Sequence, residues 1–174
     1  RDLNADGRVD VAAANHQTSS AGILLARPGG GFEATWSFFA GNGITDLAIA
    51  DFDLDGRDDI VAVSEFGFYV NVGFLPAMPR TDPTWWSTGG MHGVGALDVG
   101  DIDGDGDVDI VTADIPTSTI SVLLGAGAGG VAGPVPYPTG TDPLDVVLAD
   151  FDGDGDLDVA SISQATDAVS VLID

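Results

Sequence analysis

A nine-residue acidic segment occurs four times in this chain, and it constrains the fold more than any other feature. The copies span residues 2–10, 51–59, 101–109 and 150–158, and we call them loops 1 to 4. Their starts are 49, 50 and 49 residues apart, so the repeats fall at 1–50, 51–100, 101–149 and 150–174. This regularity predicts a repeat fold in which each structural unit carries one acidic loop.

The residues between the loops have the pattern of short strands. Each loop is followed by a run rich in Val, Ile and Ala, as in 59–64, and then by a second apolar run, as in 120–124. A more polar and aromatic run comes next, as in 32–39, and a fourth run leads into the next loop, as in 94–102. No window shows apolar residues at helical spacing. Four strands in a period of about 50 residues predict an all-β fold, a β-propeller of four-stranded blades.

Each loop places oxygen-bearing side chains at positions one, three, five and nine, with glycine at position six. Ca²⁺ takes six to eight oxygen ligands at roughly 2.3–2.6 Å, and short side chains on alternate residues of a tight turn can converge on one ion. Glycine allows the positive φ that such a turn needs, and position seven would offer its backbone carbonyl. We therefore expect up to four Ca²⁺ ions. The expected ligands are Asp2, Asn4, Asp6, Arg8, Asp10, Asp51, Asp53, Asp55, Arg57, Asp59, Asp101, Asp103, Asp105, Asp107, Asp109, Asp150, Asp152, Asp154, Asp156 and Asp158.

Two alternatives to a calcium loop of this kind are less favoured. An EF-hand shares the opening of the motif but requires Glu at position twelve. The chain has Ala13, Ala62, Thr112 and Ser161 there. Mg²⁺ prefers to keep several waters and rarely occupies a cage made only of protein oxygens. Without a metal the clustered carboxylates would repel one another, so we expect the ion to have a structural role.

The most specific resemblance to a known family lies in residues 122–158. This segment contains a Gly-rich run at 125–130, Tyr-Pro-Thr-Gly at 137–140 and loop 4 after an apolar run. With these motifs the whole chain resembles the FG-GAP/VCBS repeats of β-propellers, the family of the integrin α-subunit head and many bacterial surface proteins. The resemblance implies that each acidic loop joins the innermost strand of a blade to the second strand.

The resemblance also implies how many blades to expect. About four blades, two of them incomplete, would be present as part of a seven-bladed propeller. We therefore expect further blades, either because the chain continues at both ends or because identical chains close a ring together. The longer chain is the favoured alternative.

The composition excludes several classes of protein. Five Lys plus Arg residues against 28 Asp plus Glu give a formal net charge of −23, which argues against nucleic-acid binding. A hydrophobic content of 44% separates the chain from acidic disordered segments. Cysteine is absent, so disulfides and thiolate metal sites are excluded. The uncharged stretch 115–141 is broken by proline and glycine and cannot form a spanning helix.

Some other residues suggest chemistry but have simpler interpretations. Residues 125–130 match the dinucleotide motif G-x-G-x-x-G, yet no helix follows to meet a phosphate, so a hairpin turn is expected. We interpret His16 and His92 as solvated loop residues, and Glu65 has no catalytic partner at a recognisable spacing. The larger aromatic side chains are expected to pack between blades, with stacking on sugar rings as the alternative. They are Trp36, Trp85, Trp86, Tyr69 and Tyr137.

These observations lead to two hypotheses of function. The favoured one is a calcium-stabilised binding or adhesion module for glycans or proteins, extracellular or at the cell surface, without membrane insertion and without catalytic residues. The alternative is a calcium-dependent polysaccharide lyase, because some lyases resemble this propeller type. A lyase needs a base and a cation at the uronate group, whereas this chain has no Lys and its Arg residues are not clustered in sequence.

Overall fold

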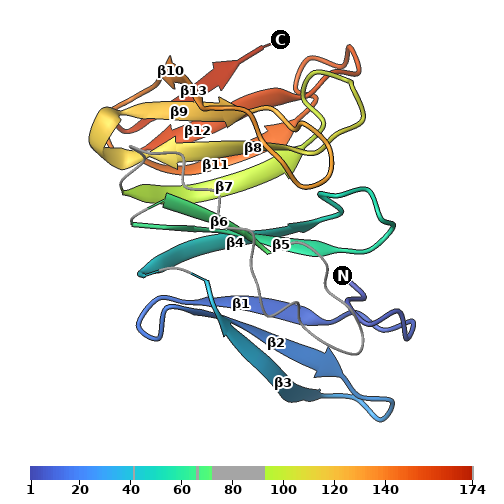
Figure 1. Cartoon of the computed structure of the whole chain (residues 1–174). Helices are drawn as coiled ribbons and strands as arrows, with labels where there is room; N and C mark the ends of the chain where they lie inside the picture. The colour runs from blue at the N-terminus through green and yellow to red at the C-terminus, as the bar shows by residue number, and fades with distance from the viewer. Residues whose placement is uncertain (41, 66, 72–92, 174) are drawn as a thin grey trace.

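The structure, a computed structural model, is all-β and describes residues 1–40, 42–65, 67–71 and 93–173. Its strands form four antiparallel sheets, which follow one another in chain order as a stack (Figure 1). Neighbouring strands within each sheet are also neighbours in the sequence, as in the blades of a β-propeller. The predicted all-β fold of propeller blades is therefore confirmed.

The strand boundaries follow the runs expected from the sequence. The first sheet contains β1 (Val11–Asn15), β2 (Ser20–Ala26) and β3 (Phe32–Phe39). The second contains β4 (Ile44–Ala50), β5 (Asp59–Ser64) and β6 (Gly67–Asn71). The third contains β7 (Val94–Gly100), β8 (Asp109–Asp114), β9 (Thr119–Leu123) and β10 (Val135–Pro138). The fourth contains β11 (Pro143–Ala149), β12 (Asp158–Ser163) and β13 (Ala168–Leu172).

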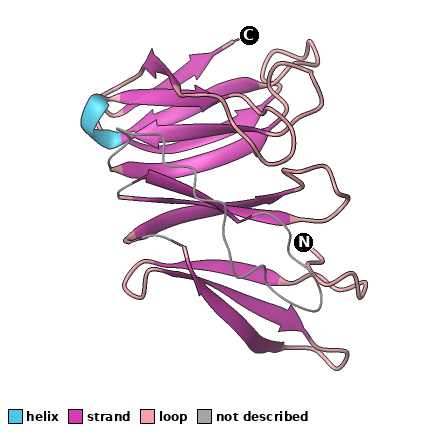
Figure 2. Ribbon diagram, in the orientation of Figure 1, coloured by secondary structure: helices cyan, strands magenta, loops and turns pink. Residues whose placement is uncertain are grey.

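Little other regular structure is present in the described part of the chain. A short 3₁₀ turn, η1 (Ile115–Thr117), connects β8 to β9 and contains a proline in its first residues (Figure 2). The polar and aromatic run of the third repeat contributes only the short strand β10, and residues 125–131 form a hairpin closed by one isolated bridge between Gly125 and Val131. None of the described segments contains a helix long and apolar enough to cross a membrane.

The sequence repeat and the structural blade are offset by one strand. Loops 2, 3 and 4 each connect the first strand of a sheet to its second strand, as loop 2 does between β4 and β5. The strand that closes a sequence repeat therefore belongs to the following sheet, as β4 and β7 show. Loop 1 precedes β1 in the same way, and all four loops lie on the same side of the stack, at the right in Figure 1.

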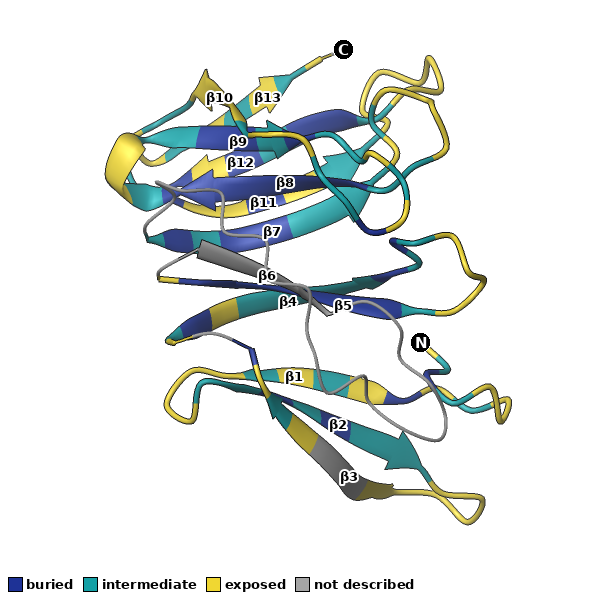
Figure 3. Cartoon of the chain, in the orientation of Figure 1, coloured by how far each residue is buried: buried dark blue, intermediate teal, exposed yellow. Residues whose placement is uncertain are grey.

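The hydrophobic core consists of layers between successive sheets. Val61 and Val63 from the second sheet, with Phe52 of loop 2, pack against Ile110 and Leu123 from the third sheet, and all five are buried. Because both faces of a central blade are covered, every residue of β5 and of β8 is buried, as the dark blue strands of Figure 3 show. Strands buried on both faces are continuously apolar rather than alternating, which explains why their runs of Val, Ile and Ala were visible in the sequence.

Candidate metal centres

Each acidic loop is held in shape by carboxylates that accept hydrogen bonds from its own backbone. In loop 2, the Gly56 N–H donates to Asp51 Oδ2 at 2.8 Å, and the Asp55 N–H donates to both Asp51 Oδ1 and Asp53 Oδ1 at 3.1 Å. Gly56 has φ of +85°, the left-handed conformation that favours glycine. The spacing of Asp and Gly in the motif thus produces a tight turn whose carboxylates surround a common centre.

The aspartate at position nine ends the loop and begins the second strand. Asp59 Oδ2 accepts the Phe52 N–H at 2.9 Å, and Asp109 Oδ2 accepts the Ile102 N–H at 2.6 Å. The other oxygen of Asp109 accepts the Gly125 N–H at 2.6 Å. Asp59 and Asp109 are both 0% exposed, so these carboxylates are fully buried where they accept the backbone N–H groups.

Loops 2, 3 and 4 each bring three of their aspartates into one group of carboxylates. Within each group, one oxygen from each residue lies within 4.8 Å of the others. Two ligands of the same Ca²⁺ ion lie at most about 5 Å apart, so this separation fits a shared cation, and an all-oxygen donor set is what hard cations prefer. The groups are Asp51, Asp53 and Asp59; Asp101, Asp103 and Asp109; and Asp150, Asp152 and Asp158.

Two aspartates of these groups have raised carboxyl pKa values, which a bound cation would lower again. For Asp152, the N–H of Asp154 lowers the carboxyl pKa, but burial and the charges of Asp154, Asp158 and Asp150 together raise it above its ordinary value. Burial raises the pKa of Asp109 despite two backbone donors. A bound divalent cation would favour the charged form of both carboxyls and offset this repulsion.

Loop 1 is built differently. Asn4 stands at position three and donates from Nδ2 to Asp6 Oδ2 at 2.9 Å, and the Arg8 guanidinium also hydrogen-bonds to Asp6. The three aspartates of this loop do not form a group like those of loops 2 to 4 in the described structure. Burial alone would raise the pKa of Asp2, but the N–H groups of Gly7 and Asp6 outweigh it and lower the pKa.

Positions five and seven lie outside the three-carboxylate groups. In every loop, Oδ1 at position five accepts the backbone N–H of position seven at 2.8–3.0 Å. The position-five residues are Asp6, Asp55, Asp105 and Asp154. The position-seven residues are Arg8, Arg57, Asp107 and Asp156. Their role as ligands remains a prediction, whereas positions one, three and nine are already together in three loops.

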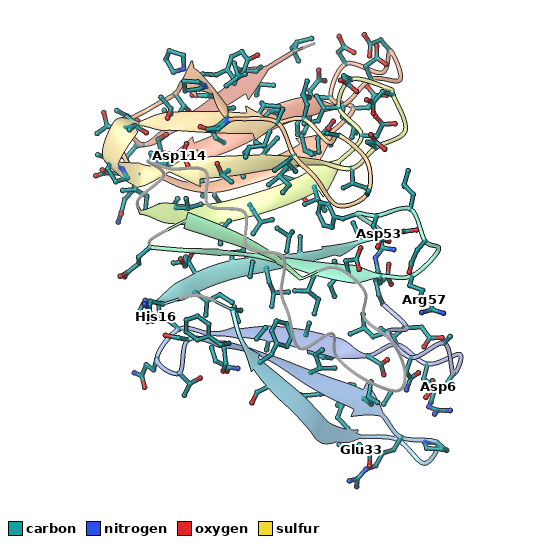
Figure 4. All side chains as sticks on the ribbon, viewed as in Figure 1. Asp6, His16, Glu33, Asp53, Arg57 and Asp114 are labelled. Atoms are coloured by element: carbon teal, nitrogen blue, oxygen red, sulfur yellow. The ribbon has the colours of Figure 1, made fainter. Side chains whose placement is uncertain are left out.

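The other candidates from the sequence are scattered. His16 Nε2 lies 3.3 Å from Glu65 Oε1 in an exposed pair, shown at the left of Figure 4 by the His16 label. Both residues occur six positions after the last aspartate of their loops. They therefore occupy equivalent positions in neighbouring repeats, and this equivalence was a signal in the sequence that they lie close together. Tyr137 is 40% exposed beside a hollow between the third and fourth sheets. His92, Trp85 and Trp86, and the side chains of Trp36 and Tyr69, lie outside the described residues.

The sequence did not single out three buried or half-buried aspartates away from the loops. Asp46 Oδ2 on β4 accepts the Leu97 N–H of β7 at 3.1 Å, and Asp98 Oδ2 on β7 accepts the Leu148 N–H of β11 at 2.8 Å. Asp114, at the end of β8 (labelled in Figure 4), accepts hydroxyl hydrogen bonds from β8 and β9 and is 6% exposed. In the sequence, these aspartates are marked only by their place within or at the end of an apolar strand.

The stacked antiparallel sheets and their acidic loops define a repeat protein built from propeller blades. The FG-GAP-like repeat matches this chain at residues 2–62 and 101–161, and each match contains two of the four loops. These two matches cover more than half of the chain, so it belongs to the FG-GAP-like repeat family. No curated protein matches it.

Solved structures share the fold at low sequence identity. The biofilm matrix protein Bap1 of V. cholerae aligns with a TM-score of 0.63 and 17% identity over 98% of this chain and 25% of its own length. BBS1N, solved in complex with ARL6DN, aligns with a TM-score of 0.62 and 10% identity over 99% of this chain and 54% of its own length. This chain thus spans about half of one relative and a quarter of the other, and the likeness concerns the fold alone.

Proposed function

We propose that this chain is a calcium-stabilised, extracellular β-propeller module that binds glycans or proteins in adhesion. The observation that carries the proposal is the set of three all-oxygen carboxylate groups, which lie along one side of the stack. Membership of the FG-GAP-like repeat family supports it. The fold shared with a biofilm matrix protein is consistent with a role outside the cell.

Calcium is the cation that the donor set favours. Aspartate oxygens on a flexible turn suit the six to eight ligands of Ca²⁺, whereas Mg²⁺ demands a smaller octahedral site and keeps its waters. Positions one, three and nine would supply carboxylates, and positions five and seven would complete the shell. Extracellular calcium modules bind with Kd of roughly 10⁻⁴ to 10⁻³ M, a concentration met outside cells.

Thermal unfolding tests the metal role. A ligand bound only to the folded state adds about 2.7 kcal/mol per site at a hundredfold excess over Kd. We expect the melting temperature to rise clearly between excess chelator and millimolar Ca²⁺, and less with Mg²⁺. Asp103→Asn should reduce the calcium effect, whereas Asp167→Asn, at an exposed aspartate outside the loops, should not. An identical melting temperature with and without Ca²⁺ would refute the proposal.

A second experiment concerns the ligand. Calcium-loaded protein on a glycan array should bind a defined set of glycans and lose that binding in chelator. The same glycans, assayed for the absorbance of unsaturated uronate, should show no product. Formation of that product would contradict the binding-module hypothesis and support the lyase hypothesis. Absence of array binding would direct the search to protein ligands by crosslinking at the cell surface.

A further inference from the structure

The Gly-rich segment at residues 125–130, which we call the glycine hairpin, has a backbone that few other residues can adopt. It follows β9 and is closed by hydrogen bonds from the Ala126 N–H to the Gly130 carbonyl and from the Gly130 N–H to the Gly127 carbonyl, both at 3.0 Å. Gly127, Ala128 and Gly129 have φ of +67°, +51° and +76°. Three successive left-handed residues require glycine at most of these positions.

One side of the glycine hairpin is fastened to loop 3. The Gly125 N–H donates to Oδ1 of Asp109, one of the three grouped carboxylates. A Cβ at residue 125 would lie 2.8 Å from Asp107 Cβ and 2.9 Å from the Val108 carbonyl oxygen, which only glycine avoids. The hairpin therefore lies directly against the backbone of this loop.

The other side of the glycine hairpin reaches the preceding blade. The Gly129 N–H donates to the Phe52 carbonyl of loop 2 at 2.9 Å, and the segment between β9 and β10 extends toward that loop in Figure 1. Phe52 stands between Asp51 and Asp53 in the chain, is 4% exposed, and donates its own N–H to Asp59 Oδ2. The backbone of one residue, Phe52, thus bonds both a grouped carboxylate and the hairpin.

From these contacts we propose that the glycine hairpin couples metal binding in loop 2 to metal binding in loop 3. The path runs from Asp59 through Phe52 and Gly129 to Gly125 and Asp109, with hydrogen bonds at both ends of one short, strained hairpin. A metal that fixes Asp109 in one loop orders the hairpin, which then holds Phe52 where the other loop needs it. The inference rests on the proposed function, because it requires that these loops bind Ca²⁺.

The hairpin of the first sheet shows which contacts of the glycine hairpin are common to other blades. The first sheet has a similar hairpin: the Ala26 N–H donates to Asp10 Oδ1 at 2.8 Å, and the Arg27 N–H donates to the Gly31 carbonyl at 2.9 Å. A Cβ at Gly29, Gly30 or Gly31 would meet nothing within 4 Å. A hydrogen bond to the position-nine aspartate is therefore present in both hairpins. Of these two hairpins, the glycine hairpin is the one for which the described structure shows a hydrogen bond to a neighbouring loop.

Calcium titration followed by NMR of glycine amides tests the coupling loop by loop. Gly56, Gly106 and Gly155 each donate an N–H to the position-one aspartate of loops 2, 3 and 4, so each amide reports its own loop. Asp103→Asn in loop 3 should raise the calcium midpoint at Gly56 about fivefold or more, the lower range of allosteric coupling. By reciprocity, Asp53→Asn should shift the Gly106 midpoint by the same factor. Asp152→Asn in loop 4, one sheet further away, should leave Gly56 unchanged.

Breaking the bridge should uncouple the loops without removing either metal group. Gly129→Val places a β-branched residue at φ of +76°, whereas Gly133→Val, the control, meets open space at an ordinary φ. We expect Asp103→Asn to have no effect on Gly56 when combined with Gly129→Val, and its full effect when combined with Gly133→Val.

The outcomes separate the two proposals. If the amides of Gly56 and Gly106 shift with Ca²⁺ but the midpoint in each loop is unchanged by the substitution in the other loop, the coupling is wrong and calcium binding still stands. Amides that do not respond to Ca²⁺ up to the highest concentration tested would overturn both.

Discussion

At the scale of single residues, the aspartate at position nine is the least replaceable part of the acidic loop. Asp109 is fully buried and accepts one backbone N–H on each oxygen, from Ile102 and Gly125. Asp105, at position five, is exposed and accepts a short-range bond from the Asp107 N–H. Aspartate at position nine therefore holds separate segments of the chain together, whereas aspartate at position five bonds within its own loop.

We predict that this difference persists without any metal. In excess chelator, Asp109→Ala should lower the free energy of unfolding by about 2 kcal/mol or more, because two partly buried backbone donors both lose their acceptor. Asp105→Ala should cost less than about 1 kcal/mol under the same conditions. Urea unfolding curves measure both, and equal losses would show that position nine matters only as a metal ligand.

A second prediction at this scale concerns Asp114 and pH. Burial raises its carboxyl pKa, although Ser121, at 2.5 Å, and Thr112, at 3.0 Å, donate hydroxyl hydrogen bonds that oppose the shift. A raised pKa means that the folded state holds the proton more tightly, so the charged carboxylate destabilises the fold above that pKa and the penalty fades as pH falls toward about 4.

Asp114→Asn tests this sign directly. The amide keeps an acceptor, and the neighbouring hydroxyls can rotate to accept from its NH₂ group. In chelator, the variant should melt higher than the unaltered protein at pH 7, and the difference should shrink toward pH 4. A difference that grows as the pH falls would show that the charged form stabilises this site.

At the scale of elements, the first strands of successive sheets are joined by side chains. Asp46 holds the Leu47 N–H on its own strand with one oxygen and the Leu97 N–H of β7 with the other. Asp98 repeats this arrangement with Val99 and with Leu148 of β11. Each carboxylate thus links an N–H of its own strand to an N–H of the first strand in the next sheet.

We predict a local loss of protection when one of these bridges is removed. Asp46→Ala should speed amide hydrogen exchange at Leu97 about tenfold or more and leave Leu148 unchanged, because unbonded amides open more readily. Asp98→Ala should do the reverse. Asp145→Ala is the matched control: Asp145 has the place of Asp46 in its strand and holds its own Val146 N–H. Equal acceleration at both leucines in every variant would indicate global destabilisation instead.

At the scale of the whole molecule, charge is unevenly distributed. The described arginines are Arg1, Arg8, Arg27 and Arg57, all in or beside the first two sheets. Loops 3 and 4 contain only acidic charges. With a net charge of −23, the folded chain gathers like charges along one side of the stack, and bound cations would offset them there.

This imbalance predicts how stability depends on salt. In chelator, the melting temperature should rise as NaCl increases from about 10 mM to about 0.5 M, because screening weakens repulsion between exposed carboxylates. With Ca²⁺ bound, the rise should be smaller, since the groups with the strongest repulsion are already neutralised. Scanning calorimetry measures both series. A salt effect that is equal with and without Ca²⁺ would place the repulsion elsewhere on the surface.

Much of this architecture was predictable because it repeats along the chain. The acidic loops and the runs after them specified β5, β8 and β12, whose bounds begin at the position-nine aspartates. The carboxylate groups of loops 2 to 4 also followed from spacing, since all their members lie within nine residues. Local turn chemistry and strand pairing with the next segment need no knowledge of distant contacts.

The sequence alone therefore determined the fold class, the four loops and the residues able to hold a cation. The tertiary structure decided which carboxylates join neighbouring blades, that His16 meets Glu65, and that the glycine hairpin touches two loops at once. The contacts between blades, such as Asp46 with Leu97, His16 with Glu65 and Gly129 with Phe52, join residues about 50 or more positions apart. Periodicity states which segments are equivalent, but the stacking of one sheet on the next sets the distance between them, and that distance decides which polar groups bond.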